Sequence, residues 1–369
     1  MALLRETAGP KVCAALCIKA LRALGSGMGQ RRIRNQKGEL FPMNEGAVQN
    51  AVSIPRGGDR RQDRVTAANW TGPERRLGIR RVADLPQGLH LLDLSHPPSY
   101  GFRNFICAWF FVDALGRRIL VDPGPAHSVP LLVERIRAVA NGVDLILLTH
   151  VHPTHSGGVA KICEIFGGVK VVVHPEGRRL LLETPEREDG AAPLDPYFLW
   201  HRDTLEEVEI LETPGRTPDH LSFIASVQGQ RIFFAGEAAG MFIPLGSTPT
   251  LPYMRPSTPP GFDAEAAKAS LAKMERAFHG DGLLCYGHWG AARRPQFLLA
   301  LARGQLDEWI SAVTKMKGQS AEAIADHLLQ NDPLLGGYGR LPEELRTKER
   351  LSVETGVRGL AKYLAVPIV

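Results

Sequence analysis

The pattern of apolar and polar residues divides the chain near residue 88. Residues 25–86 are rich in Arg, Gly, Gln and Asn and have no sustained apolar period, so we expect no packed core there. From residue 88 onward, short apolar runs with strand character alternate with longer stretches of helical period. Helices that alternate with short strands are typical of a layered α/β architecture.

The first part of this ordered region predicts a hairpin followed by alternating helices and strands. Strands are expected at 89–94, 105–112, 118–121, 144–148 and 169–173, and helices at 129–139 and 158–166. Ser128 is a suitable cap for the first helix, Pro130 lies in its first turn and Gly142 lies beyond its end.

A second set of elements repeats the theme and ends in helices. Strands are expected at 208–211, 221–227, 231–235 and 282–286, and helices at 264–278, 297–316, 321–329 and 343–364. The last three helices carry no chemical motif. We expect them to pack on the core. Two more specific functional alternatives are that they line a substrate pocket or form a dimer contact.

Charge separates the same two regions. Residues 1–90 contain 16 Lys and Arg against 7 Asp and Glu, whereas the rest of the chain contains 28 against 32. The overall charge of +5 therefore belongs to the N-terminal extension, and the body is mildly acidic. The arginines lack a regular interleaving of aromatic residues, which favours a disordered basic extension over residues 1–87 rather than a nucleic-acid-binding or membrane-binding arm.

The cysteines and the hydropathy indicate a cytoplasmic protein. The five cysteines are irregularly spaced and form no CxxC pair, which fits a reducing compartment. The apolar run 105–112 is far too short to span a membrane. Residues 12–24 are interrupted by Lys19 and Arg22 and make a poor signal peptide.

The densest chemical signal is a cluster of three histidines. His150, His152 and His155 lie in one short loop, Thr149 to Gly158, directly after a predicted buried strand. Alternation places His150 and His152 on one side of an extended segment, and His155 returns toward them as the chain enters a helix. Imidazole nitrogens are favoured ligands of borderline metals such as zinc, so the cluster indicates a present or ancestral metal site.

The chain resembles the metallo-β-lactamase superfamily in five motifs that occur in the family's order. The resemblance covers about residues 88–365 and is closest to the bacterial general metallo-hydrolases. The five motifs are Val121–Pro125, the histidine loop in place of HxHxDH, Thr213–His220, Phe233–Gly240 and Tyr286–Gly290.

The resemblance implies a fold, an activity and a set of ligands. The fold is an αββα sandwich of two mixed β-sheets with extra C-terminal helices. The activity is hydrolysis of an ester, thioester, lactone or amide-like bond by a metal-bound hydroxide. The implied metal ligands are His150, His152, His155, Glu237 and His288. Zinc is the expected metal, with one ion favoured over two, and iron(II) also suits these ligands.

Three ligand positions depart from the family pattern. Glu237 replaces the bridging Asp and keeps a carboxylate, while Thr154 replaces an Asp and removes an anionic ligand. Arg216 replaces the third histidine of the first metal, and a guanidinium cannot donate a lone pair to a cation.

These departures leave three alternatives open. In the leading one, a single ion has three protein ligands, Glu237 is catalytic, and Arg216 holds a substrate carboxylate or phosphate or stabilises an oxyanion. In the second, Arg216 neutralises Glu237 in place of metal, and the protein is an inactive binding domain. In the third, two ions remain and water or His220 fills the gaps; this is disfavoured because His220 matches a position behind the ligands.

Several single residues carry weaker signals. Asp122 resembles the turn aspartate that supports the family's ligands, although satisfying backbone donors in the turn is an equally good interpretation. His174 is better explained as an ordinary histidine at a strand end, and Cys285 as a small buried strand residue.

The organisation expected from the sequence has three parts. Residues 1–87 form the extension, 88–292 a metallo-β-lactamase-like domain, and 293–369 a helical segment packed on that domain. The expected partner is a small-molecule substrate, with no nucleic acid and no membrane span, and a homodimer is reasonable. A nuclease-like activity draws only on the basic extension and has no support in the acidic body.

Overall fold

The computed structural model describes residues 33–34, 40–41, 85–95, 105–183, 198–199, 205–243, 253–278, 280–288, 290–341 and 343–369. Contacts divide the chain into two units, of which the smaller comprises 1–54 and 247–251. In that unit two short strands, β1 (Ile33–Arg34) and β2 (Leu40–Phe41), pair antiparallel. The expectation of a disordered extension over 1–87 lies almost wholly outside the described residues. It stays a prediction.

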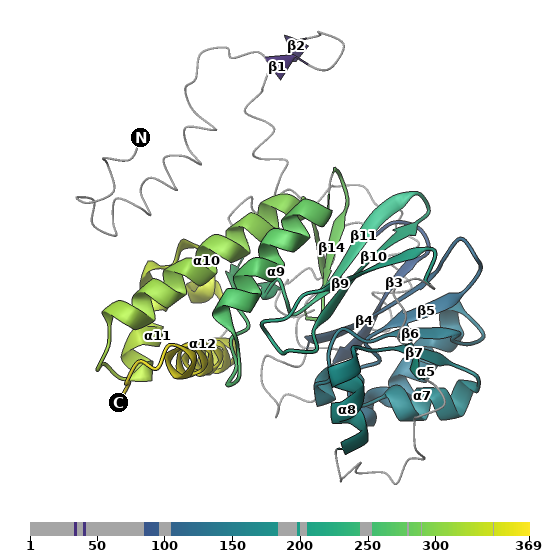
Figure 1. Ribbon diagram of the computed structural model, residues 1–369, viewed down its shortest axis with the longest axis horizontal. Helices are drawn as coiled ribbons and strands as arrows, with labels where there is room; N and C mark the ends of the chain where they lie inside the picture. Colours follow the sequence, from purple (N-terminus) through teal and green to yellow (C-terminus); the bar gives the residue numbers. More distant parts are fainter. Residues whose placement is uncertain are drawn as a thin grey trace. The chain divides into compact units, whose positions relative to one another are not determined.

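The larger unit contains a six-stranded mixed sheet (Figure 1). The strands follow one another in chain order across the sheet: β3 (Leu89–Ser95), β4 (Phe105–Val112), β5 (Arg118–Val121), β6 (Leu145–Leu147), β7 (Lys170–Val172) and β8 (Phe198–Leu199). The first two pairings are antiparallel and the last three are parallel. The parallel part aligns the carboxyl ends of β5 and β6 at one edge of the sheet, where the histidine loop begins.

A second, five-stranded mixed sheet faces the first. Its order is β15 (Ala291–Arg293), β14 (Leu283–Tyr286), β11 (Gln230–Gly236), β10 (Leu221–Val227) and β9 (Val208–Glu212). Only the central pairing of β11 with β14 is parallel. A separate ribbon pairs β12 (Met241–Ile243) with β13 (Tyr253–Arg255) antiparallel.

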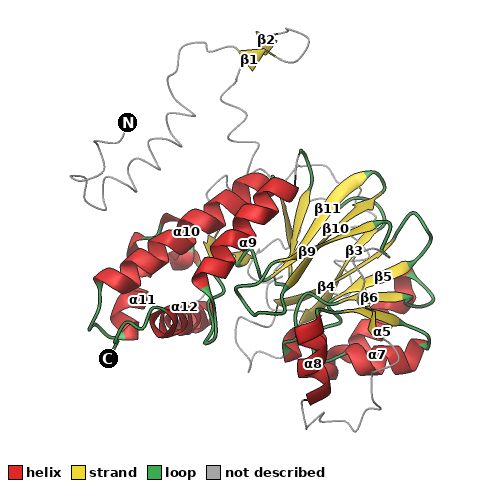
Figure 2. Cartoon of the chain, in the orientation of Figure 1, coloured by secondary structure: helices red, strands yellow, loops and turns green. Residues whose placement is uncertain are grey.

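Helices cover the outer face of each sheet (Figures 1 and 2). The first sheet carries α5 (Val129–Val139), α7 (Val159–Phe166) and α8 (Pro175–Glu183), while the four-residue α6 (Pro153–Ser156) lies in the histidine loop. The second sheet carries α9 (Ala264–Ala277) and α10 (Pro295–Lys315), and α11 (Ala321–Asn331) and α12 (Glu343–Tyr363) pack against α10.

Three apolar cores hold these layers together. One lies between the sheets and includes Trp109 of β4 and Phe234 of β11. A second packs the first sheet on α5 and α7, and a third packs the second sheet on α9 to α12. Two sheets with helices outside each are the αββα sandwich expected from the sequence.

Helix α12 packs unusually close to the segment after β13. A Cβ atom at Gly359 would overlap the carbonyl oxygen of Thr258, so this position requires glycine. The Thr258 hydroxyl donates a hydrogen bond to the carbonyl oxygen of Gly356 at 3.0 Å. These contacts fix α12 as one wall of the site described below.

Most predicted elements are found within two residues of their expected bounds, and β4 matches at both ends. The helix expected after Ser128 is present, but Ser128 makes no side-chain capping hydrogen bond. The sequence reading missed α8, β8 and the short strands β12, β13 and β15. Within the described residues, no helix combines the length and apolarity needed to cross a membrane.

Candidate metal centre

The candidate centre lies where loops leave the facing sheets. Asp122 follows β5 in a left-handed backbone conformation with φ 51°. Its carboxylate accepts two hydrogen bonds from Thr149, from the backbone N at 2.8 Å and from the hydroxyl at 2.7 Å. The loop after β6 is thereby tied to the loop after β5, and this contact fixes where the histidine cluster starts.

Glu237 enters from the second sheet at the end of β11. The residue before it, Gly236, has φ 53°, and a Cβ atom there would come within 2.8 Å of Thr149 and His220. Glycine is therefore required for β11 to approach the histidine loop so closely. This approach brings the Glu237 carboxylate, which is only 4% exposed, among the histidines.

Three imidazoles converge on one oxygen of that carboxylate. The Nε2 atoms of His155, His288 and His150 lie 3.2, 3.4 and 3.6 Å from Glu237 Oε1. Among the described residues, the ligand atoms of His150, His155 and Glu237 all lie within 4.8 Å of one another, and all three residues are buried. His288 is not part of that closer set.

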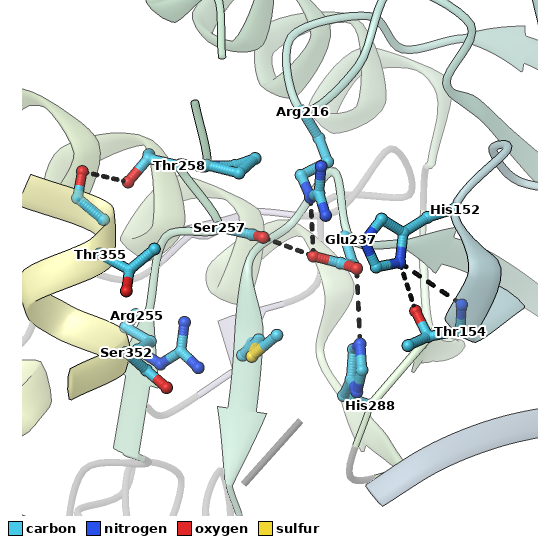
Figure 3. A pocket seen from close by; sticks show the side chains of 13 residues that line it. His152, Thr154, Arg216, Glu237, Arg255, Ser257, Thr258, His288, Ser352 and Thr355 are labelled. Carbon is cyan, nitrogen blue, oxygen red and sulfur yellow. Dashed lines mark hydrogen bonds and ion pairs between the residues drawn. The ribbon is translucent and has the colours of Figure 1, made fainter. Parts of the chain in front are cut away.

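The other carboxylate oxygen is bound by an arginine and a serine. Arg216 Nε donates to Glu237 Oε2 at 2.9 Å, and the Ser257 hydroxyl donates to the same oxygen (Figure 3). Arg216 is 8% exposed, so the ion pair is buried. The two oxygens of Glu237 are thus divided between a cationic side and an imidazole side.

Hydrogen bonds behind the histidines orient the rings. His155 Nδ1 lies 3.1 Å from Asp122 Oδ2, and His150 Nδ1 lies 3.0 Å from the Thr149 hydroxyl. Both rings therefore direct Nε2 toward Glu237. Asp122 is one of the residues that support the centre, in addition to its contacts in the turn.

His220 lies behind the centre with both ring nitrogens engaged. Its Nε2 accepts the backbone N–H of Glu237 at 3.2 Å, and its Nδ1 lies 2.9 Å from the Thr213 hydroxyl. Burial lowers the pKa of His220 to about 3, so the ring is neutral. These contacts argue against His220 as a replacement ligand.

The protonation states around Glu237 follow from burial and from the neighbouring charges. Burial lowers the pKa of His150 well below its usual value. Burial also opposes protonation of His155, but the carboxylates of Asp122 and Glu237 outweigh it and raise the pKa of His155 to about 9. Burial would raise the pKa of Glu237, but Arg216 and the histidines hold it well below its usual value. Glu237 is therefore a carboxylate.

His152 lies beside this group rather than within it. Its Nδ1 atom is 2.6 Å from the Thr154 hydroxyl and also accepts the Thr154 backbone N–H at 3.4 Å. His152 and Thr154 line a pocket together with Arg216, Glu237 and His288 (Figure 3). Of the five predicted metal ligands, the structure thus brings three into the closest set, with His288 and His152 at its edge.

The opposite wall of this pocket was not anticipated by sequence reasoning. It is formed by Arg255 of β13 and by Ser352 and Thr355 of α12. Each of these residues is ordinary in the sequence, and only the packing of α12 on the segment after β13 brings them together. The one usable signal was the unassigned C-terminal helices, for which lining a pocket was an alternative.

A second pocket adjoins the first at Arg216, Glu237 and Ser257. Its remaining lining is mostly apolar and includes Phe262, Ala267, Leu271, Ala302 and Leu306. The buried ion pair therefore stands between a polar pocket and an apolar one.

The donor set fits a divalent metal ion. Ligands held 2.0 to 2.2 Å from a tetrahedral zinc ion lie roughly 3.3 to 3.6 Å from one another, which matches the separations of 3.2 to 3.6 Å around Glu237 Oε1. His150 Nε2 is buried and has no hydrogen-bond partner in the described part of the chain. A buried ring nitrogen without a partner is costly unless something else occupies its lone pair.

Comparison with known proteins agrees with the fold. The model of the metallo-beta-lactamase superfamily matches residues 103–324. That range is more than half of the chain, and the chain belongs to this superfamily. The fold is shared with a beta-lactamase domain protein from Burkholderia ambifaria, at TM-score 0.51 and 17% identity, covering 80% of this chain and 94% of that one.

The curated relatives are similar over shorter ranges. A hydroxyacylglutathione hydrolase from Xanthomonas euvesicatoria pv. vesicatoria (strain 85-10) is 30% identical over 192 residues, which are 50% of this chain and 60% of the relative. A hydroxyacylglutathione hydrolase from Stenotrophomonas maltophilia (strain R551-3) is 32% identical over 120 residues, or 32% of this chain and 41% of the relative. The chain therefore matches at most about three fifths of the length of these two relatives.

Proposed function

We propose that this protein is a metal-dependent hydrolase of small ester or thioester substrates, with one ion held by His150, His155 and Glu237. The observation that carries the proposal is the convergence of buried imidazoles on Glu237 Oε1, with His150 Nε2 left without a hydrogen-bond partner in the described part of the chain. Relatives named hydroxyacylglutathione hydrolase support hydrolysis of a thioester.

Zinc suits these ligands best, and iron(II) is the second choice. The chemistry that such an ion supplies is Lewis acidity, which polarises a carbonyl group and lowers the pKa of water toward neutrality. The residues of the chain would hold the ion and orient the ligand side chains. Asp122 and Thr149 set the ring orientations of His155 and His150, and Arg216 fixes the Glu237 carboxylate.

Arg216 has a role in this proposal that differs from the substrate contact expected in the sequence analysis. Its Nε is committed to Glu237 Oε2, so Arg216 acts first as a positioning residue. Its positive charge would also favour a developing oxyanion on a substrate bound where the two pockets meet. Substrate would lie where the polar and apolar pockets meet, since Arg216, Glu237 and Ser257 line both.

A second candidate is a binding domain without metal, and the Arg216–Glu237 contact is the observation that favours it. In that case the arginine replaces the cation electrostatically. The division of the carboxylate argues for the hydrolase, because Arg216 and Ser257 use only Oε2 and Oε1 remains directed at the imidazoles.

Metal content distinguishes the two candidates. The full chain, purified without chelator or histidine tag, is expected to contain about one equivalent of zinc or iron by elemental analysis. The His150→Ala, His155→Ala double variant should lose that metal, whereas His327→Ala on α11 should retain it. The protein should also hydrolyse members of a thioester and ester panel, and chelation should abolish that activity.

An absence of metal from the wild-type chain, even after zinc or iron(II) is supplied, would contradict the hydrolase and favour the binding domain. Equal metal content in the wild type and the double variant would place the metal elsewhere.

A further inference from the structure

The pocket wall opposite the metal centre contains a second buried arginine. Arg255 is 5% exposed and lies at the end of β13, where Figure 3 shows its guanidinium beside Ser352 and Thr355 of α12.

A buried carboxylate holds Arg255 in place through a single contact. Arg255 Nε donates to Glu349 Oε1, and the Tyr253 hydroxyl donates to the same oxygen at 2.9 Å. Glu349 is fully buried, and its Oε2 has no hydrogen-bond partner in the described part of the chain. In the most favourable arrangement of an arginine–carboxylate pair, two guanidinium nitrogens donate to the two carboxylate oxygens. Here the pairing is one-sided, so the guanidinium is not turned fully toward Glu349.

The arrangement makes Arg255 a fixed donor at the pocket wall. The side chain of Arg255 is among those lining the pocket, with the hydroxyl groups of Ser352 and Thr355 beside it. A guanidinium presents its donors in a planar fork that matches a carboxylate.

We infer that Arg255 binds a carboxylate group of the substrate through its guanidinium. Ser352 and Thr355 shape the wall beside it, since their hydroxyls donate to the carbonyl oxygens of Lys348 and Leu351 in α12. This inference rests on the proposed function and narrows it to esters or thioesters that carry a carboxylate near the scissile bond. A carboxylate group, with one negative charge, suits Arg255 better than a phosphate group with two, because Glu237 lines the same pocket and Glu349 already offsets the charge of Arg255.

The test is direct binding, measured by calorimetry on the full chain after its metal has been removed by a chelator. Sodium succinate is the probe, its uncharged diamide succinamide is the matched neutral probe, and inorganic phosphate is the third. We expect succinate to bind at least tenfold more tightly than succinamide, and more tightly than phosphate. Hydrolysis and metal play no part in this measurement.

Two variants assign the binding to Arg255. Arg255→Lys keeps the charge beside Glu349 but loses the planar fork, and succinate affinity should fall at least tenfold. The Arg255→Met, Glu349→Leu double variant removes both charges, so it tests the same point should the lysine variant fail to fold. Arg231→Gln, at an exposed arginine paired with Glu209, is the control and should bind succinate as the wild type does.

Equal affinity for succinate and succinamide, no succinate binding, or unchanged binding in both Arg255 variants would overturn the inference. Phosphate binding without succinate binding would overturn the choice of a carboxylate. A protein that contains metal but fails to bind succinate would lose only this inference, whereas one that binds succinate but holds no metal would lose only the hydrolase.

Discussion

Two buried arginine–glutamate pairs face each other across one pocket, and they differ in what surrounds the carboxylate. In both pairs the arginine uses its Nε atom and a single carboxylate oxygen. The second oxygen of Glu237 meets three imidazoles, whereas the second oxygen of Glu349 has no hydrogen-bond partner among the described residues. In the proposed function the same kind of ion pair therefore serves two purposes: at Glu237 it prepares a cation site, and at Glu349 it positions an arginine.

The largest effect is expected from breaking the pair at Glu349. Glu349→Leu leaves Arg255 buried without its partner, which should lower the free energy of unfolding by about 3 to 5 kcal/mol. Urea denaturation with and without zinc measures the loss, and zinc should not diminish it. The Arg255→Met, Glu349→Leu double variant should recover most of the stability.

A control on the same helix guards against a general effect of changing α12. Arg350→Met removes the partly exposed pair with Asp326 and should change the urea midpoint little. A similarly small change in Glu349→Leu would show that the second pair is not held as tightly as its burial implies.

A smaller loss of stability, which depends on whether zinc is bound, is expected at the Arg216–Glu237 pair. Arg216→Met leaves the buried Glu237 carboxylate with only Ser257 and the imidazoles. The loss of one charged hydrogen bond should lower the free energy of unfolding of metal-free protein by about 2 to 3 kcal/mol. Zinc should restore much of that loss, because a bound cation replaces the missing charge. Equal destabilisation with and without zinc would contradict the claim that only the Arg216–Glu237 pair adjoins a cation site.

The smallest effect is expected at Ser257. Ser257→Ala removes one hydrogen bond to Glu237 Oε2 while Arg216 stays in place, which should lower the free energy of unfolding by about 1 kcal/mol. Metal content should stay near one equivalent, because Oε1 and the imidazoles are untouched. Loss of metal in this variant would mean that Oε2, rather than Oε1, faces the ion.

The sequence predicted the fold and the histidine side of the site because both are encoded locally. Apolar periods gave the strands of both sheets, and His150 and His155 lie five residues apart in one loop. It left the Arg216–Glu237 contact as one of three alternatives, because the sequence alone does not say whether a metal ion or an arginine neutralises the Glu237 carboxylate.

The pocket wall that contains Arg255 could not be predicted from the sequence for a different reason. Arg255 and Glu349 are 94 residues apart, and neither stands in a motif. Strand β13 has three residues, too few for a hydrophobic period to reveal it. Only tertiary packing selects these residues from many similar arginines and glutamates in the chain.

The glycine at 359 offers a way to recognise the same pocket wall in other sequences. Because any side chain there would collide with the carbonyl of Thr258, α12 keeps its position only when this residue is glycine. Chains that combine this glycine with an arginine and a glutamate at the places of Arg255 and Glu349 should share the substrate preference. Chains with a larger residue there should have a remodelled pocket even when every histidine is retained, so two superfamily members with the same metal ligands can be separated by one position on a distant helix.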